Sequence, residues 1–243
     1  MDLQDKTALI TGGGSGIGLG IAGALADEGC RVVIAGRNEA KLAAAAEARS
    51  QPPELLYHTV DVADRGSVVE LVDKTIERLG RIDILVNGAG MNIKNRGLAE
   101  MRPEQWDEII AVNLTGAYNC LIAALPHMRS RGDGLVLNIS SVAGKRAMLL
   151  GGVAYDASKF GMTALGACAW QEEAEHGIRV TNIYPGEVDT PLLDVRPNPV
   201  SDTHRAGVLQ IEDLGAIAVA LAKLPPHAHV PELVIKPLQQ MYA

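Results

Sequence analysis

The stretch Thr7-Ala8-Leu9-Ile10-Thr11-Gly12-Gly13-Gly14-Ser15-Gly16-Ile17-Gly18 decides the fold of this chain. It begins as a short apolar, β-prone run, passes through a glycine-rich turn and leads into an amphipathic helical pattern from Leu19 to Glu28. In this order, glycines let the backbone approach a pyrophosphate, and the start of the helix offers unpaired N–H groups. The stretch therefore predicts a dinucleotide-binding unit, and the alternative is a plain tight turn with surplus glycine.

The remaining chain repeats this alternation of strand-like and helix-like segments. Further strands are predicted at residues 31–35, 55–60, 82–86, 135–139, 178–183 and 232–235. Helices are predicted at 38–49, 64–79, 103–129 (two consecutive pieces, the second broken or kinked near Pro126), 153–176 and 212–224. Such strands pair in parallel through right-handed crossovers. The expected fold class is α/β: a doubly wound, Rossmann-like parallel sheet of about seven strands with helices on both faces, in a single domain over residues 1–243.

Unusual residues gather directly after the predicted strands. Ligands of such sheets lie outside the carboxyl ends of the strands, so a binding site should show this clustering. After the glycine turn, the segments in question are Gly36-Arg37, Asp61-Val62, Asn87 to Gly90, Ser140-Ser141 and Pro185-Gly186. Agreement between the fold pattern and the position of these residues supports both interpretations.

Charge and hydropathy exclude several classes of partner. The formal net charge is −7, and no basic stripe or basic patch with interleaved aromatic residues occurs, which argues against nucleic acid or an anionic membrane as the main partner. The N-terminal residues Met1 to Lys6 are polar, and no stretch reaches the roughly 18 uninterrupted apolar residues of a membrane span. We expect a soluble cytoplasmic protein.

The metal-ligating residue types form no recognisable site. Cys30, Cys120 and Cys168 are widely separated and odd in number, so we interpret them as small buried apolar residues in a reducing compartment. His227 and His229 have no further cluster of ligands near them. We therefore expect no bound metal.

Tyr155 and Lys159 are four residues apart within a predicted helix, which places a phenol and an ammonium group on one face. An adjacent cation favours the phenolate and brings the pKa of a tyrosine down toward neutral pH. Such a group can protonate an alkoxide or deprotonate an alcohol. On its own this spacing also occurs by chance on solvated helices, so its meaning depends on the other motifs.

Together these features resemble the short-chain dehydrogenase/reductase family, in its compact branch. The resemblance runs from Lys6 to about Thr190. It is carried in order by Thr11 to Gly18, Asp61-Val62, Asn87 to Gly90, Asn113, Ser141, Tyr155 with Lys159, and Pro185-Gly186.

The resemblance implies four catalytic residues. Tyr155 would exchange the proton with the substrate oxygen, and Lys159 would lower the pKa of Tyr155 and bind the nicotinamide ribose. Ser141 would hold the carbonyl oxygen as negative charge develops on it. Asn113 would fix a water that links Lys159 to solvent.

Two of these assignments have alternatives. Asn113 could merely bond the backbone at a helix kink. Ser140 competes with Ser141, and we prefer Ser141 because Ser141-Val142-Ala143-Gly144 matches the Ser-x-x-Gly run of the family.

The resemblance also implies the cofactor contacts. Asp61 would hydrogen-bond the adenine and Val62 would pack against it, although Asp61 could instead cap a turn. The family often has Asn at the position of Gly88, where this chain departs from the pattern. The full set of expected cofactor-binding residues is Gly12, Gly14, Ser15, Gly16, Ile17, Gly18, Arg37, Asp61, Val62, Asn87, Ala89, Tyr155, Lys159, Pro185, Gly186, Val188 and Thr190.

The end of the second strand favours NADP(H) over NAD(H). A carboxylate there would bond the adenosine 2′-hydroxyl and repel a 2′-phosphate. This chain has Gly36 and then Arg37, whose guanidinium binds phosphate through charge-assisted hydrogen bonds. The alternative is that Arg37 is an ordinary solvated charge.

The C-terminal third implies the substrate lid. Residues 191–210 occupy the position of the family's lid, and they contain Pro191, Pro197 and Pro199, so we expect a small and partly rigid segment. Four basic residues lie on loops that should border the active site: Lys94, Arg96, Lys145 and Arg146. They either attract an acidic substrate or are ordinary solvated charges.

The expected function is hydride transfer between NADP(H) and a small carbonyl or secondary alcohol substrate. Alternatives are a non-catalytic dinucleotide sensor, a methyltransferase and a nucleotide-sugar epimerase. The helices predicted around residues 111–128 and 153–176 are apolar on more than one face, which together with the resemblance predicts a homodimer or homotetramer.

Overall fold

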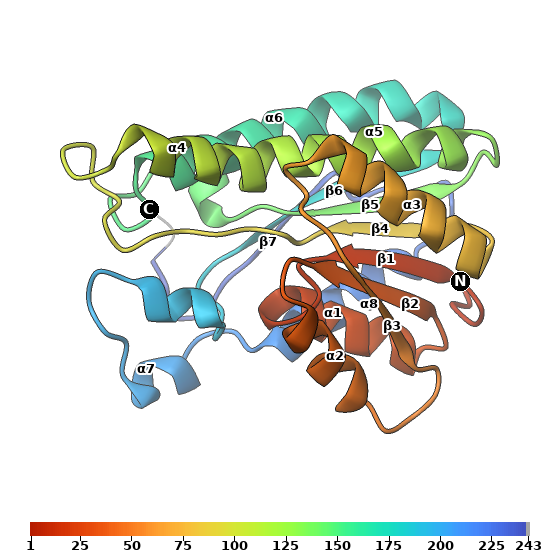
Figure 1. Cartoon of the computed structure of the whole chain (residues 1–243), viewed down its shortest axis with the longest axis horizontal. Helices are drawn as coiled ribbons and strands as arrows, with labels where there is room; N and C mark the ends of the chain where they lie inside the picture. The colour runs from red at the N-terminus through yellow and green to blue at the C-terminus, as the bar shows by residue number, and fades with distance from the viewer. Residues whose placement is uncertain (242–243) are drawn as a thin grey trace.

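One sheet of seven parallel strands forms the centre of the protein (Figure 1). The computed structural model describes residues 1–241. The strand order is β3-β2-β1-β4-β5-β6-β7, which confirms the doubly wound α/β fold and reverses direction between β1 and β4. The strands are β1 (Thr7–Thr11), β2 (Arg31–Gly36), β3 (Leu55–Thr59), β4 (Ile84–Asn87), β5 (Gly134–Ile139), β6 (Ile178–Pro185) and β7 (Glu232–Ile235).

Helices cover both faces of this sheet (Figure 1). One layer contains α1 (Gly16–Asp27), α2 (Glu39–Glu47) and α8 (Ile211–Ala222). The opposite layer contains α3 (Arg65–Leu79), α4 (Pro103–Ile110), α5 (Gly116–Arg129) and α6 (Val153–Glu173). Short turns of helix are η1 (Ala111–Thr115), η2 (Val142–Gly144), η3 (Ala174–His176), η4 (Pro191–Val195) and α7 (Asp202–Ala206).

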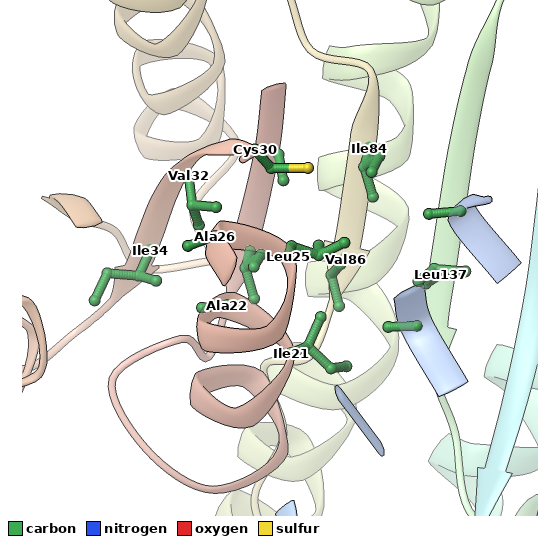
Figure 2. Packing of buried hydrophobic residues seen from close by; sticks show 14 of the residues in the cluster. Ile21, Ala22, Leu25, Ala26, Cys30, Val32, Ile34, Ile84, Val86 and Leu137 are labelled. Atoms are coloured by element: carbon green, nitrogen blue, oxygen red, sulfur yellow. The ribbon is translucent and has the colours of Figure 1, made fainter. Parts of the chain in front are cut away.

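The central strands are apolar throughout because both of their faces are buried. In β1, Ile10 belongs to the core beneath α1 and α8, whereas Leu9 belongs to the core on the α3 and α5 side. Figure 2 shows the first of these cores, where Ile21 and Leu25 of α1 lie among strand side chains such as Ile34 and Val86. This packing fixes the start of α1 against the carboxyl end of β1.

The helical stretch over residues 103–129 is divided into two consecutive pieces, α4 and α5, as the sequence predicts, and it is interrupted between them. The interruption is η1, a π-helical turn, whereas α5 continues through Pro126. Pro126 lacks the N–H that would bond the carbonyl of Ile122, but both residues are exposed, so solvent can satisfy that carbonyl. A break of the second piece at Pro126 is therefore wrong, and the irregular turn between the two pieces contains Asn113.

The same stretch, Pro103–Arg129, is long and apolar enough by composition to cross a membrane. However, 56% of the relevant window is buried inside the fold, as is usual for core helices.

The segment 191–210 contains the short helical turns η4 and α7, which the sequence analysis did not predict. Burial raises the pKa of the Cys30 and Cys120 thiols to about 12, but Cys168 is exposed on α6, so the expectation of three buried cysteines is wrong for it. Within residues 1–241, no group of three or more His, Cys, Asp or Glu side chains is placed to hold a metal ion.

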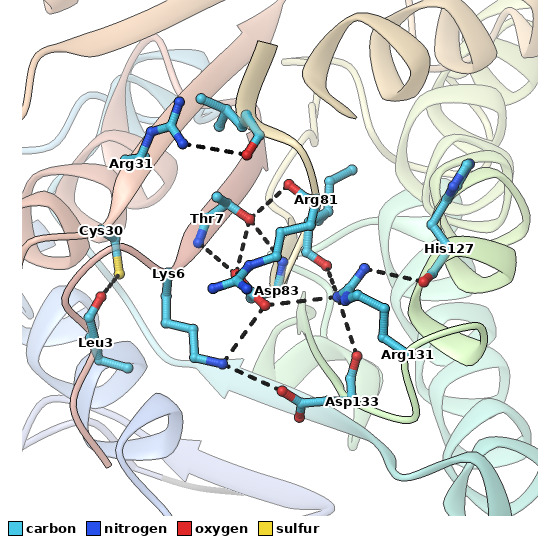
Figure 3. A network of polar contacts seen from close by, with 12 residues as sticks. Leu3, Lys6, Thr7, Cys30, Arg31, Arg81, Asp83, His127, Arg131 and Asp133 are labelled. Carbon is cyan, nitrogen blue, oxygen red and sulfur yellow. Dashed lines mark hydrogen bonds and ion pairs between the residues drawn. The ribbon is translucent and has the colours of Figure 1, made fainter. Parts of the chain in front are cut away.

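A charged network joins the amino ends of β1 and β4 (Figure 3). The buried Asp83 carboxylate accepts hydrogen bonds from the Thr7 N–H at 2.8 Å and from Arg81 Nε at 2.9 Å. It also pairs with Lys6 at 3.7 Å and with Arg131 at 3.8 Å. These contacts lie at the amino ends of the strands, opposite to their carboxyl ends.

Asp83→Ala is expected to lower the free energy of unfolding by about 2–4 kcal/mol, because it leaves a buried N–H and several cations without their partner. Urea denaturation measures the change. Asp133→Ala is the matched control: this exposed carboxylate pairs with Lys6, and its loss should cost about 0–1 kcal/mol. Equal effects of the two substitutions would show that the Asp83 network does not stabilise the fold.

Candidate active site

The glycine turn leaves a floor of bare backbone between β1 and α1. Gly12 has a φ of +70°, and a Cβ atom added to it would lie 2.6 Å from the Gly88 carbonyl oxygen. A Cβ added to Gly18 would lie 2.5 Å from the Gly12 carbonyl oxygen, and one added to Gly88 would lie 2.7 Å from that of Thr11. Side chains are therefore excluded at all three positions in this structure. The glycine at position 88, where the family often has Asn, fits this close contact between backbones.

The N-terminus of α1 is suited to an anion. Its N-cap residue, Ser15, makes no side-chain capping bond, and the first turn contains no acidic residue. The first N–H groups of the helix therefore have neither a side-chain cap nor a nearby carboxylate to compete with a ligand, and the helix dipole favours negative charge there. These features fit the pyrophosphate of a dinucleotide.

Two neighbouring pockets that share Gly12, Ser15 and Gly90 form a trough along the carboxyl ends of the strands, beginning at this floor. On the side of β2 and β3 it is lined by Gly12, Gly14, Ser15, Arg37, Asp61, Val62 and Ala89. On the side of β5 it is lined by Gly16, Ile17, Gly18, Tyr155, Lys159 and Thr190. An adjoining pocket, which also contains Tyr155, is lined by Ser141, Pro185, Gly186 and Val188. The structure thus brings together all but two of the residues predicted from the sequence.

The two exceptions, Asn87 and Asn113, are buried beneath the surface of the trough. The Asn113 amide donates to the Met91 carbonyl at 3.0 Å and to Ser158 Oγ at 3.1 Å, and its Oδ1 accepts from the Met91 N–H at 2.8 Å. Asn113 therefore ties η1 to the loop after β4 and to α6. Bonding to the backbone was the alternative role considered for Asn113, and the structure shows these bonds. Asn113 is also close to Lys159, because the Asn113 Oδ1 and the Lys159 ammonium both lie near Gly90.

Asn87 begins a ladder of buried asparagines that the sequence analysis missed. Asn87 donates to Asn138 at 2.9 Å, Asn138 donates to Asn182 at 3.0 Å, and Asn182 donates to the Thr163 carbonyl on α6 at 3.0 Å. The three residues are register partners near the carboxyl ends of β4, β5 and β6. The available signal was one asparagine near the end of each of these predicted strands. The ladder links the sheet to the helix that carries Tyr155.

At the β2 and β3 end, Arg37 is 55% exposed, and its guanidinium lies 3.7 Å from the Glu108 carboxylate. Asp61 lines the same part of the trough, but its Oδ1 accepts from the Ala63 N–H at 3.0 Å. Asp61 thus caps a turn, which was the alternative to an adenine contact, and its second carboxylate oxygen makes no hydrogen bond in the described part of the chain.

Tyr155 and Ser141 meet at the junction of the trough and the adjoining pocket. Burial raises the pKa of the Tyr155 phenol, while a hydrogen bond with Ser141 and the charge of Arg96 act to lower it. Ser141 is fixed as the N-cap of η2, where its Oγ accepts from the Ala143 N–H at 3.1 Å. Ser140 instead donates to the Lys159 carbonyl, whereas Ser141 is the serine that acts on the pKa of the phenol.

Lys159 is buried beside Tyr155, one turn further along α6. Its ammonium donates to the Ile139 carbonyl at 2.8 Å and lies 5.6 Å from the centre of the Tyr155 ring. Burial lowers the pKa of Lys159 to about 8. That Lys159 lowers the pKa of Tyr155 stays a prediction; in this structure burial raises the pKa of the phenol, and the Lys159 ammonium donates to a backbone carbonyl.

The lid segment closes the other side of the trough. Thr190 precedes η4 and packs against the glycine turn, so that a Cβ added to Gly16 would lie 3.1 Å from its methyl carbon. Arg205 of α7 binds Asp189 at 2.6 Å, and Arg196 pairs with Glu187 at 3.1 Å. These ion pairs hold both short helices of the lid to the segment that follows β6.

The profile of a family described as short chain dehydrogenase matches residues 6–199. This chain belongs to the short-chain dehydrogenase family. An uncharacterized oxidoreductase of Staphylococcus saprophyticus is 36% identical over 244 residues, which cover 98% of this chain and 100% of that protein.

Solved structures of short-chain dehydrogenases have the same fold. An alcohol dehydrogenase from the archaeon Thermococcus sibiricus, complexed with 5-hydroxy-NADP, has a TM-score of 0.86 at 30% identity and covers 97% of this chain and 98% of its own. A 3-ketoacyl-(acyl-carrier-protein) reductase from Brucella melitensis, complexed with NADH, has a TM-score of 0.87 at 29% identity and covers 98% and 100%.

Membership of this family makes the protein an oxidoreductase that uses a nicotinamide dinucleotide and a small-molecule substrate. A non-catalytic sensor is not favoured. The described residues fit the cofactor, because the bare glycine floor and the uncapped start of α1 face the trough that leads to Tyr155.

The buried Lys159 predicts an unusual dependence of stability on pH. Between about pH 8 and pH 10.5 the folded protein has lost the Lys159 proton that the unfolded chain still holds, so stability rises with pH in this window. Relative to Lys159→Met, the wild type should gain about 2–3 kcal/mol of unfolding free energy from pH 7 to pH 10. Urea titrations at several pH values give the difference, and parallel pH curves for the two proteins would contradict it.

Proposed function

We propose that this short-chain dehydrogenase interconverts a carbonyl compound and its secondary alcohol with NADP(H). The observation that carries the reaction type is the placement of Tyr155 and Ser141 in one pocket, with Tyr155 also lining the trough. A methyltransferase would have no need of this pair, and the family assignment does not favour a sensor.

Each side chain of the site has a separate role in carbonyl reduction. The nicotinamide supplies the hydride when it is bound. The Ser141 hydroxyl donates a hydrogen bond to the substrate oxygen as negative charge grows on it, and Tyr155 transfers its proton to that oxygen. The raised pKa of Tyr155 keeps the phenol protonated at neutral pH, which suits proton donation. Lys159, with a pKa of about 8, is suited to returning a proton to the phenol and would bind the ribose.

Tyr155→Phe is expected to leave cofactor affinity unchanged and to lower kcat by at least about 100-fold on any carbonyl substrate that the wild type reduces, because the proton donor is lost. Steady-state kinetics and a cofactor titration measure the two effects. Tyr57→Phe, at an exposed tyrosine on the edge strand β3, is the control and should behave as the wild type. Near-full activity of Tyr155→Phe would sink the mechanism.

The proposed preference for NADP(H) is supported by the charge at the end of β2. Gly36 leaves no carboxylate to repel a 2′-phosphate, and Arg37 lines the trough together with Asn38 and Lys41. The nearest competing acid is Glu108, which pairs with Arg37 at 3.7 Å. A 2′-phosphate in this part of the trough would meet two cations.

Arg37→Ala should weaken NADPH binding by about tenfold to a hundredfold, the size of a charge-assisted contact, and leave NADH binding nearly unchanged. Gly36→Asp should reverse the preference. Glu108→Gln should have the opposite effect to Arg37→Ala: it removes the acidic partner of Arg37 and should strengthen NADPH binding. Titration of each variant with both cofactors tests the assignment, and tighter binding of NADH than NADPH by the wild type refutes it.

We also propose that the protein assembles into a homodimer or homotetramer through the outer face of α5 and α6. Tyr118 and Ile122 of α5 and Phe160 of α6 are large, apolar and exposed, and the two helices lie side by side in one layer (Figure 1).

Sedimentation at micromolar concentration should therefore give a multiple of the 25.7 kDa chain mass. Ile122→Glu, which places a charge on this face, should shift the protein toward the monomer. A wild type that sediments only as a monomer contradicts the proposal.

A further inference from the structure

The pocket that adjoins the cofactor trough contains two arginines, although the protein as a whole carries a net charge of −7. Arg96 comes from the loop after β4, and Arg196 comes from the end of η4. Both line the same cavity as Tyr155 and Ser141. A cationic pocket in an acidic protein is a local feature that the overall composition does not explain.

Arg96 lines this pocket and is only 7% exposed. Its guanidinium donates to the Ile93 carbonyl at 2.8 Å, the Leu150 carbonyl at 2.7 Å and the Val195 carbonyl at 2.6 Å. These bonds use three of the five N–H donors of a guanidinium, so two donors remain. One side chain thus joins the loop after β4, the loop before α6 and the lid.

The charge of Arg96 has no direct counter-ion. All three acceptors are neutral carbonyls, and within residues 1–241 no carboxylate lies within 4 Å of its guanidinium. Asp156 is near enough to act on it by charge, but the Asp156 carboxylate accepts from the Met148 N–H. Arg196 opposes the charge of Arg96. Burial of such a cation is costly unless an anion approaches it.

Arg196, in contrast, is already neutralised. Its guanidinium pairs with Glu187, and the same carboxylate binds His204 of α7. Glu187 is the only acidic residue that lines the pocket among the described residues, and it is occupied by these two partners. The remaining positive charge of the pocket is therefore that of Arg96, which lines the same cavity as the Tyr155 phenol and acts to lower its pKa.

We propose that the substrate carries a carboxylate, which Arg96 binds while the carbonyl or alcohol carbon lies at Tyr155 and Ser141. This inference rests on the proposed function and adds the substrate class: an oxo acid or hydroxy acid. The charge-assisted contact would select acids over their neutral esters, because an ester leaves the buried guanidinium without a counter-ion.

A binding experiment tests the substrate class without turnover. The probes are 4-oxopentanoate and 5-oxohexanoate, each beside its methyl ester, titrated calorimetrically into the NADP⁺-loaded protein, since oxidised cofactor cannot reduce a ketone. At least one acid should bind about tenfold or more tightly than its ester. Reduction of the same probes with NADPH is measured separately.

Variants separate anion binding from a purely structural role of Arg96. Arg96→Met should remove the difference between acid and ester, and Arg96→Lys should restore part of it because the charge returns. Lys94→Met is the matched control: it removes one exposed positive charge from the same loop and should leave the ratio unchanged. The ratio is informative even where Arg96→Met loosens the loops, because such damage affects both probes.

Each result decides the inference. Equal binding of both acids and their esters by the wild type overturns it, and so does an Arg96→Met variant that weakens acid and ester by the same factor, which would make Arg96 only a clamp for the loops. If the protein neither binds NADP⁺ nor reduces any ketone, the proposed function fails. The same titrations on the protein without cofactor then still decide whether Arg96 binds the carboxylate.

Discussion

Close contact between three glycine backbones is the constraint on which the rest of the site depends. Gly12, Gly18 and Gly88 meet where the strand order reverses, and none of them has room for a Cβ atom. Their contact brings the ends of β1 and β4 against the start of α1. Without it, the unpaired N–H groups of the helix would not face the trough, and the trough would not run unbroken to Tyr155.

Buried hydrogen bonds to the sheet hold the helix that carries the reactive groups. The asparagine ladder crosses three strands and ends on α6, and Lys159 is directed to the Ile139 carbonyl at the end of β5. Buried polar groups satisfied in this way are rigid, because breaking one bond leaves another group unpaired. The orientation of Tyr155 therefore depends on the sheet as much as on its own helix.

Local spacing predicted the parts of the site that belong to one segment. The glycine turn and the pair Tyr155 and Lys159 could be found because each lies within a few residues of its partners, and the alternation of strands and helices predicted the topology. Contacts between segments could not be found in this way. The burial of Arg96, the ladder from Asn87 and the exposure of Cys168 depend on how loops and helices pack in three dimensions. The pKa of Tyr155 illustrates the limit, because the desolvation that raises it is a property of the folded pocket.

The Asp83 network (Figure 3) lies at the amino ends of the strands. The reactive groups lie at the carboxyl ends, with the length of the strands between the two regions. Substitutions in two regions that share no contacts have nearly additive effects on stability. The loops at the carboxyl ends of the strands can therefore diverge in sequence, and the enzyme can evolve toward other substrates. The Asp83 network at the amino ends continues to stabilise the fold.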